Sequence, residues 1–151
     1  MGEVPAIREI QPVKMKIGLI SCTKSKMAGK CRASDMYSKS ALFRAGWQYL
    51  KKYCDKIYIM SAKYGLLEPE EIIEPYNETL NTKSVRERKI WSYKIIKSLE
   101  EKVDLKNDNF IILGGHNYTQ YIRLKIKNYK IPLENIRGIG NQISILNQLN
   151  K

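Results

Sequence analysis

The sequence predicts an α/β protein, a three-layer sandwich with a small, mainly parallel sheet and helices on both faces. Apolar runs of strand length occur at residues 15–21, 57–60 and 110–113. After a polar or glycine-rich break, each run is followed by a segment whose apolar residues have helical spacing. Strands that alternate with helices in this way are typical of a parallel sheet covered by helices.

The amino-terminal part of the fold is expected to be a strand, a basic loop and a helix. Residues 15–21 form the strand and residues 22–35 the loop. Ser34 or Asp35 is a suitable N-cap for a helix over residues 36–53, in which apolar residues recur every three or four positions.

The second strand, residues 57–60, leads into a long irregular segment. Residues 61–80 contain one glycine and two prolines, together with large apolar and aromatic side chains. Such side chains argue against disorder, and ordered loops of this length are usually functional. We therefore expect residues 62–80 to form a lid or wall of a site.

The remaining elements follow the same alternation. Thr82 is expected to cap a helix over residues 83–102. The third strand, residues 110–113, ends in Gly-Gly-His, and a helix over residues 117–127 follows it. A short helix over residues 141–150 closes the fold.

We expect a single α/β domain over residues 15–151, preceded by a flexible N-terminal arm of residues 1–14. The sequence has 151 residues and is 43% hydrophobic, which is enough for one core. The arm has two prolines and no periodic pattern. Because no apolar stretch has the length of a membrane span and no secretory signal is visible, we expect a cytoplasmic protein without a membrane partner.

Charge and cysteine content narrow the function classes. The sequence holds 27 Lys and Arg against 15 Asp and Glu, a net charge of +12. This favours an anionic partner such as a nucleic acid, a nucleotide or another phosphate ester, although solubility alone would also explain it. The expected partner is thus a nucleotide, nucleobase or nucleic acid. The cysteines are odd in number and share no metal-type spacing with the single histidine, so we expect no disulfide, no metal and no cofactor. Oligomeric state is not indicated.

Polar or glycine-rich segments end all three predicted strands, and these ends should meet at one edge of the sheet, where α/β proteins bind ligands. The basic segment after the first strand could hold a phosphate or carboxylate, and the tyrosines could stack on a base. Solvated loops and ordinary core packing are the alternatives. The candidate binding residues are Ser21, Thr23, Lys24, Lys26, Tyr37, Ser61, Tyr64, Gly65, Tyr76, Asn77, Gly114, Gly115 and His116.

The candidate catalytic residues are Glu74, Lys63 and Cys22. Glu74 is followed by a rigid Pro-Tyr pair and could act as a general acid or base. Lys63 could clamp an anion or act as a base, and Cys22 lies close to lysines that would favour a thiolate. An exposed acidic loop, a surface lysine and a buried packing cysteine are the respective alternatives.

Several motifs resemble those of a group of small uncharacterised bacterial and phage proteins. The resemblance spans about residues 15–150. It rests on Ile-Ser-Cys-Thr-Lys-Ser-Lys at 20–26, Met-Tyr-Ser-Lys-Ser-Ala-Leu-Phe-Arg-Ala at 36–45, Met-Ser-Ala-Lys-Tyr-Gly-Leu-Leu-Glu-Pro at 60–69, Ile-Glu-Pro-Tyr-Asn-Glu-Thr-Leu at 73–80 and Gly-Ile-Gly-Asn-Gln at 138–142.

More distantly, residues 61–69 and the Pro-Tyr pair resemble the YaaA peroxide-stress proteins, which are associated with DNA binding. Residues 22–26 are similar to a segment of the archaeosine synthase lineage, which modifies a 7-deazaguanine base in tRNA. Both resemblances imply the handling of a nucleobase or nucleic acid.

The sequence thus favours an enzyme that acts on a nucleotide, nucleobase or nucleic acid, by glycosidic-bond chemistry or group transfer, at the carboxyl edge of a parallel sheet. A non-catalytic basic protein that binds DNA or RNA is one alternative. A sensor of a small phosphorylated, nucleotide-like metabolite is the other.

Overall fold

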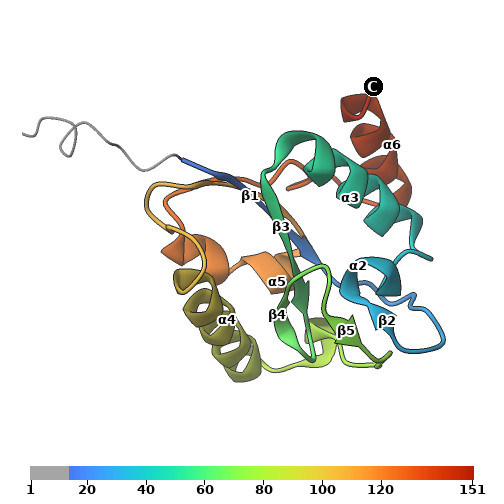
Figure 1. Ribbon diagram of the computed structural model, residues 1–151, viewed down its shortest axis with the longest axis horizontal. Coiled ribbons are helices and arrows are strands. Elements are labelled where there is room, and N and C mark those ends of the chain that lie inside the picture. Colours follow the sequence, from blue (N-terminus) through green and yellow to red (C-terminus); the bar gives the residue numbers. More distant parts are fainter. Residues whose placement is uncertain (1–13) are drawn as a thin grey trace, which may run out of the picture.

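A five-stranded sheet forms the middle layer of the computed structural model, which describes residues 14–151 (Figure 1). The strand order is β4-β3-β1-β6-β7, and every neighbouring pair is parallel except β3 with β4. The strands are β1 (Lys16–Ser21), β3 (Lys56–Ser61), β4 (Gly65–Leu67), β6 (Asn109–Leu113) and β7 (Asn128–Lys130). The predicted three-layer α/β sandwich with a mainly parallel sheet is confirmed.

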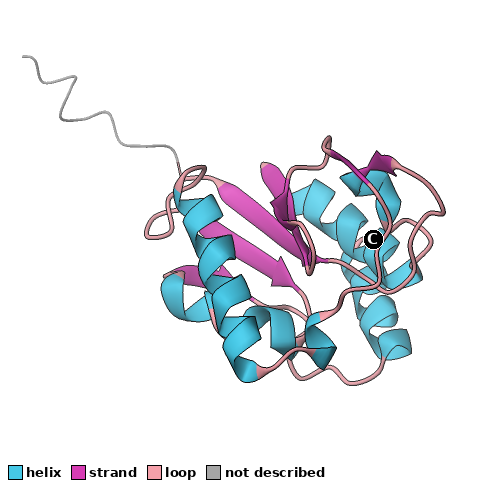
Figure 2. Cartoon of the chain, turned by 90° about the horizontal axis from the view of Figure 1, so that it is seen from below, coloured by secondary structure: helices cyan, strands magenta, loops and turns pink. Residues whose placement is uncertain are grey.

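Helices cover both faces of this sheet (Figures 1 and 2). On one face lie α3 (Ala41–Tyr53) and α6 (Ile139–Leu149); on the other lie α4 (Val85–Glu100) and the short α5 (His116–Thr119). The central strands are buried on both sides, which explains why they are apolar without alternation. The predicted arm, residues 1–14, lies outside the described residues except for Lys14.

Close packing of α3 on the sheet depends on two glycines. A Cβ atom on Gly18 in β1 would lie 3.1 Å from both Leu50 methyl carbons, and one on Gly46 in α3 would lie 3.1 Å from Ile20 Cδ1 and Leu113 Cδ1. Contacts this short are rare for real side chains. Gly18 and Gly46 therefore allow α3 to approach the strands closely.

The helix predicted over residues 36–53 is wrong at its start. A short α2 (Ala33–Met36) is separated from α3 by residues 37–40, and the N-cap of α3 is Ser40, whose Oγ accepts a hydrogen bond from Phe43 N at 3.1 Å. Neither Ser34 nor Asp35 caps α3. The break brings residues 37–40 to the edge of the sheet.

The long segment after β3 has more structure than predicted. Gly65, with φ of +78°, allows the chain to turn back into β4. A second, two-stranded sheet then pairs β5 (Ile72–Ile73) with β2 (Cys31–Arg32) from the loop after β1, and a 3-10 helix, η1 (Leu80–Thr82), ends the segment. The loops after β1 and β3 are thereby joined.

Two further helix predictions need correction. α4 begins after Ser84, which forms a capping box with Glu87, so Thr82 is not its cap. In place of the single helix predicted over residues 117–127, the structure has α5 and a separate 3-10 helix, η2 (Ile122–Lys125). The strand that follows, β7, was not predicted from the sequence. Within residues 14–151, no helix is long and apolar enough to cross a membrane.

Candidate functional site

A cavity of about 1100 Å³ lies beyond the carboxyl ends of β1 and β6. Its walls come from the loops after these strands, from α3 and α6, and from the segments around residues 77–81 and 131–136. A smaller hollow of about 300 Å³, which includes Met15 and Asp108, lies at the opposite edge of the sheet. Ligand sites in parallel sheets form at the carboxyl edge, so the larger cavity is the candidate site.

Three lysines, Lys24, Lys26 and Lys39, line the cavity. Lys26 Nζ lies 4.5 Å from the centre of the Tyr76 ring and donates a hydrogen bond of 3.3 Å to the Lys24 carbonyl. Partial burial lowers the pKa of Lys26. Among residues 14–151, no carboxylate forms an ion pair with any of these lysines. Their charge is thus available to an anionic ligand.

A second group of lining residues is apolar. It comes from α3, from α6 and from the chain that leads into α6. This group consists of Leu42, Phe43, Ile131, Leu133, Ile136, Ile139, Ile143 and Leu146. Basic and apolar surfaces therefore face the same space.

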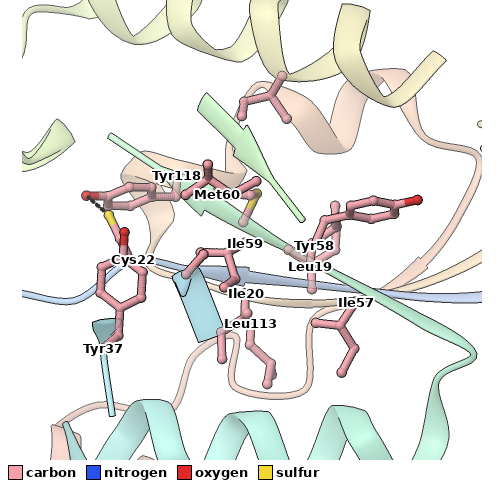
Figure 3. Close-up of a cluster of buried hydrophobic side chains, with 14 of the residues drawn as sticks. Leu19, Ile20, Cys22, Tyr37, Ile57, Tyr58, Ile59, Met60, Leu113 and Tyr118 are labelled. Atoms are coloured by element: carbon pink, nitrogen blue, oxygen red, sulfur yellow. Dashed lines mark hydrogen bonds between the residues drawn. The ribbon is translucent and has the colours of Figure 1, made fainter. Parts of the chain in front are cut away.

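Cys22, the first residue after β1, lines the cavity and is only 8% exposed. Its Sγ lies 3.6 Å from the Tyr118 hydroxyl, to which it donates, and accepts a hydrogen bond of 3.4 Å from Ala62 N. Figure 3 shows the tyrosine ring reaching across to the thiol from α5. Cys22 thus links the ends of β1 and β3 to the helix after β6.

The glycines after β6 also line the cavity. A Cβ atom on Gly114 would lie 3.2 Å from Ser21 Cβ, whereas one on Gly115 would meet nothing within 4 Å. A side chain at position 114 would therefore crowd Ser21, whereas one at position 115 would not. His116 begins α5 and is exposed at the cavity.

A buried hydroxyl cluster joins the loops behind the cavity. Tyr37 Oη and Tyr76 Oη lie 2.7 Å apart, and the Ser61 hydroxyl donates to Tyr76 Oη at 2.7 Å. Ser61 Oγ also accepts from Lys63 N and Tyr64 N, which fixes the turn into β4. Burial raises the pKa of both buried tyrosines. Tyr37 has no exposed surface, so in this structure it organises the site and offers no face for stacking.

The predicted binding and catalytic residues form two separate groups. Those that line the cavity are Ser21, Cys22, Thr23, Lys24, Lys26, Asn77, Gly114, Gly115 and His116. Those that do not line it are Tyr37, Ser61, Lys63, Tyr64, Gly65, Glu74 and Tyr76. Most of the first group follows the ends of β1 and β6, whereas the second group, apart from Tyr37, comes from the segment of residues 61–76.

Lys63, Tyr64 and Glu74 lie on the outside of that segment. The Tyr64 hydroxyl is 3.3 Å from Glu74 N and 3.4 Å from Glu74 O, and Lys63 Nζ lies 5.3 Å from the Tyr64 ring centre. The Glu74 side chain is exposed and forms no ion pair with the described residues. Catalytic roles for Lys63 and Glu74 stay predictions.

Sequence reasoning missed several polar residues of the cavity wall. They are Lys39, Ser40, Thr79, Asn81, Glu134, Asn135 and Gln142. The Ser-Ala-Leu-Phe start of α3 carried a usable signal, because Ser40 is a good N-cap and would have placed this turn at the sheet edge. Glu134 and Asn135 come from the irregular chain before α6 and gave no such signal, whereas Gln142 lies in α6 and in the Gly-Ile-Gly-Asn-Gln motif at 138–142.

Glu78 and Glu134 are the carboxylates that line the cavity. Glu78 Oε2 lies 4.0 Å from Lys83 Nζ, whereas Glu134 is held in a hydrogen-bonded ion pair with Arg123, which lowers the pKa of Glu134. No cluster of His, Cys, Asp and Glu within residues 14–151 could hold a metal ion. Of the two carboxylates, Glu78 is therefore the freer to act as an acid or base, and His116 is a second lining residue with a side chain of that kind.

Comparison with known proteins places the sequence in a family. Residues 17–148 match the family described as "Family of unknown function (DUF6884)". The chain belongs to this family. The DUF6884 match covers every element from β1 to α6, so the cavity described above lies wholly within it.

A relative of the chain is found in Bacillus subtilis (strain 168). The chain is 27% identical over 143 residues to the protein named "Uncharacterized protein YfjM", an alignment that covers 88% of this chain and 93% of that protein. No solved structure matches the chain. These findings support the predicted family of small uncharacterised proteins; the resemblances to YaaA proteins and to archaeosine synthases stay predictions.

Proposed function

We propose that this protein is an enzyme that binds a nucleotide, or a nucleotide of a nucleic acid, in the 1100 Å³ cavity and acts on its glycosidic bond or transfers a group to it. The observation that carries the proposal is that three lysines and a group of apolar side chains line the same cavity. A nucleotide combines the matching features, with a phosphate at one end and a flat, weakly polar base at the other. Ligand pockets of roughly 300–1000 Å³ accept molecules of this size.

The lysines and the apolar lining residues have different roles in this proposal. Lys24, Lys26 and Lys39 hold the phosphate, because they line the cavity and lack carboxylate partners among the described residues. The apolar wall from α3 and α6 receives the base. The unpaired amides near the start of α3 add to this anion preference, since a helix amino terminus carries partial positive charge.

Glu78 is the proposed acid or base, in place of Glu74, because its side chain lines the cavity. In glycosidic-bond cleavage it would protonate the leaving base or take a proton from the attacking nucleophile. Cys22 is the candidate nucleophile, since it lines the same cavity and its Sγ already lies at hydrogen-bond distance from the Tyr118 hydroxyl.

The first experiment measures binding. Thermal shifts are recorded with nucleotides, nucleobases including 7-deazaguanines, and sugar phosphates; a ligand at about 100 times its dissociation constant adds roughly 2.7 kcal/mol. Lys26→Ala should weaken binding of the ligand found, about tenfold for the loss of one charged contact. The matched control is Lys30→Ala, in the same loop but outside the cavity lining. Equal binding by both variants would contradict the phosphate assignment.

The second experiment separates binding from turnover. Incubation with the ligand is followed by chromatography for a released base or a new product. Glu78→Gln should keep binding and lose turnover, whereas Glu74→Gln should keep both. Loss of turnover in Glu74→Gln alone would return the role to the residue predicted from sequence.

A second candidate function is a non-catalytic protein that binds DNA or RNA. The net charge of +12 favours it. It predicts stabilisation by polyanions alone, with binding that weakens steeply as salt rises, and no effect of Glu78→Gln or Cys22→Ala. Stabilisation by one small molecule in moderate salt would exclude it.

A further inference from the structure

The outward surface of α4 is basic and contains an exposed aromatic ring. It consists of Arg86, Lys89, Ile90, Tyr93 and Lys97, called here the α4 outer face. All five side chains are exposed, and Tyr93 is 63% exposed. The spacing of Arg86, Ile90, Tyr93 and Lys97 follows one helical stripe, which spans about 16 Å at 1.5 Å per residue.

The acidic residues of α4 do not cancel this charge. The Glu87 carboxylate accepts a hydrogen bond from Ser84 N and serves as part of the helix cap. Glu100 lies at the carboxyl end of the helix, 3.8 Å from Lys97. Arg86 and Lys89 form no ion pair with any residue of the described chain. Positive charge is therefore free along the amino-terminal half of the stripe.

The basic surface continues onto the neighbouring η2 helix. Lys89 Nζ lies 5.5 Å from the ring centre of Tyr121, immediately before η2. Leu124 and Lys125 in η2 are both exposed, Leu124 to 74%. Leu124 and Lys125 thus extend the pairing of apolar and basic side chains from α4 onto η2.

The α4 outer face begins beside the cavity. Arg88, on the buried side of the same helix, donates hydrogen bonds to the carbonyls of Leu80 and Asn81 at 2.9 and 3.3 Å, and Asn81 lines the cavity. Lys83, next to the Ser84 cap, pairs with Glu78 of the cavity wall. The amino end of α4 is therefore fastened to the cavity wall, and the stripe leads away from it.

We propose that the α4 outer face binds a single-stranded nucleic acid, with its phosphates on the basic side chains and an unpaired base on Tyr93. Flexible basic chains around an accessible aromatic ring are the combination that binds single strands without strong sequence preference. A duplex would leave Tyr93 without a base to stack on. Trp91, Ile95, Ile96 and Leu99 of α4 are buried in the protein core. The apolar residues of α4 that stay exposed, Val85 and Ile90, are too few to form the broad apolar face by which a helix enters a membrane interface.

This inference also narrows the substrate of the cavity. A strand on the α4 outer face would have one end close to the cavity wall at Asn81, so the nucleotide acted on would belong to a nucleic acid strand. Only this connection rests on the proposed function; strand binding by α4 does not.

The test measures binding of a fluorescent oligothymidylate of about 12 nucleotides, a length that one single-strand-binding domain covers. Replacing Arg86, Lys89 and Lys97 by Gln should lower the affinity and should reduce the salt dependence by about 2 units of log-log slope, at about 0.7 per phosphate contact. The matched control replaces Lys51, Lys106 and Lys130 by Gln, which removes the same charge from exposed positions elsewhere. Equal loss in the control would overturn the proposal.

Tyr93 gives the sharper variant. Tyr93→Ala should weaken binding about tenfold, since stacking contributes about 1–3 kcal/mol per base, whereas Tyr93→Phe should bind like the unmodified protein. Because Tyr93 is exposed, neither variant should change the unfolding temperature by much. Unchanged binding by Tyr93→Ala would overturn the stacking assignment.

Two further measurements distinguish a single strand from a duplex and from a lipid membrane as the partner of the α4 outer face. Duplex of the same length should bind more weakly than single strand, and vesicles containing phosphatidylserine should not compete for the protein. Equal or tighter duplex binding, or competition by vesicles, would overturn the proposal.

Thymidine monophosphate binding, measured separately with Lys26→Ala, reports on the cavity alone. Strand binding without mononucleotide binding would support the α4 surface and contradict the proposed function. Mononucleotide binding without strand binding would support the proposed function and contradict the α4 surface.

Discussion

The hydroxyl of Ser61 donates a 2.7 Å hydrogen bond to the hydroxyl of Tyr76, across 15 residues of chain. Ser61 ends β3, and Tyr76 follows β5 in the segment predicted to wall the site. Tyr37 Oη lies a further 2.7 Å from Tyr76 Oη. The loops after β1 and β3 are therefore held together by buried hydroxyl groups. The Tyr76 ring, fixed in this way, lies against Lys26 of the cavity lining.

Tyr76→Phe should destabilise the protein by about 1–3 kcal/mol, because two buried hydroxyl groups lose a partner. Urea unfolding followed by circular dichroism measures the free energy. The matched control is Tyr93→Phe, which removes an exposed hydroxyl and should change the free energy by less than about 0.5 kcal/mol. A similar value for both variants would show that the hydroxyl cluster contributes nothing.

The stability of the protein should decrease in alkali. Burial raises the pKa of Tyr118 to about 12 from its ordinary 10.0, so the folded protein keeps this proton when the unfolded chain has lost it. The stabilisation is complete below pH 10 and is lost as the pH rises from 10 to about 12. Unfolding midpoints in urea should fall over this window, and less steeply in Tyr118→Phe. Parallel pH profiles for the two proteins would contradict the shift.

Gly114→Ala should disturb the cavity floor. Its Cβ would lie 3.2 Å from Ser21 Cβ and 3.3 Å from Ser21 Oγ, and overpacking of this kind costs about 1–3 kcal/mol. The neighbouring Gly115→Ala is the control, because a Cβ there meets nothing within 4 Å. Thermal unfolding of the two variants compares them directly. Equal stabilities would mean that Ser21 can move without cost.

A bound nucleotide should protect Cys22 from alkylation. Cys22 lines the cavity and is buried, whereas Cys31 and Cys54 lie elsewhere and are partly exposed. Iodoacetamide labelling, read by peptide mass spectrometry, should be slowest at Cys22 and slower still with ligand, while Cys31 and Cys54 label at unchanged rates. Ligand-dependent protection of Cys31 instead would place the ligand outside the cavity.

Ser84→Ala should destabilise the protein by about 0.5–2 kcal/mol, because it removes the acceptor for Glu87 N at the start of α4. Thr82→Ala should cost less, since the Thr82 hydroxyl donates only one exposed hydrogen bond to the Thr79 carbonyl. Urea unfolding of both variants tests which residue caps the helix. A larger loss in Thr82→Ala would support the cap predicted from the sequence.

Much of the fold was readable from the sequence because its signal is local. Strands such as Lys16–Ser21 are buried on both faces and so appear as short apolar runs, and α4 has a clear helical period. The errors occur where tertiary contacts replace local preference. β7 has three residues and depends on pairing with β6, and residues 37–40 leave the helix pattern where Tyr37 joins the hydroxyl cluster.

The sequence by itself determined the order of the three central strands and the three long helices, and with it the edge at which the strand ends meet. Apolar periodicity and glycine positions carry that information, and they are set by neighbours along the chain. Only the tertiary structure decided which candidates share one space: Cys22, Lys26 and His116 line the cavity, while Lys63, Tyr64 and Glu74 do not. The physical reason is the strand order, in which β3 and its hairpin partner β4 lie on the side of β1 away from β6. The turn after β3, which holds Lys63 and Tyr64, is therefore beside the cavity between the ends of β1 and β6 but outside its lining.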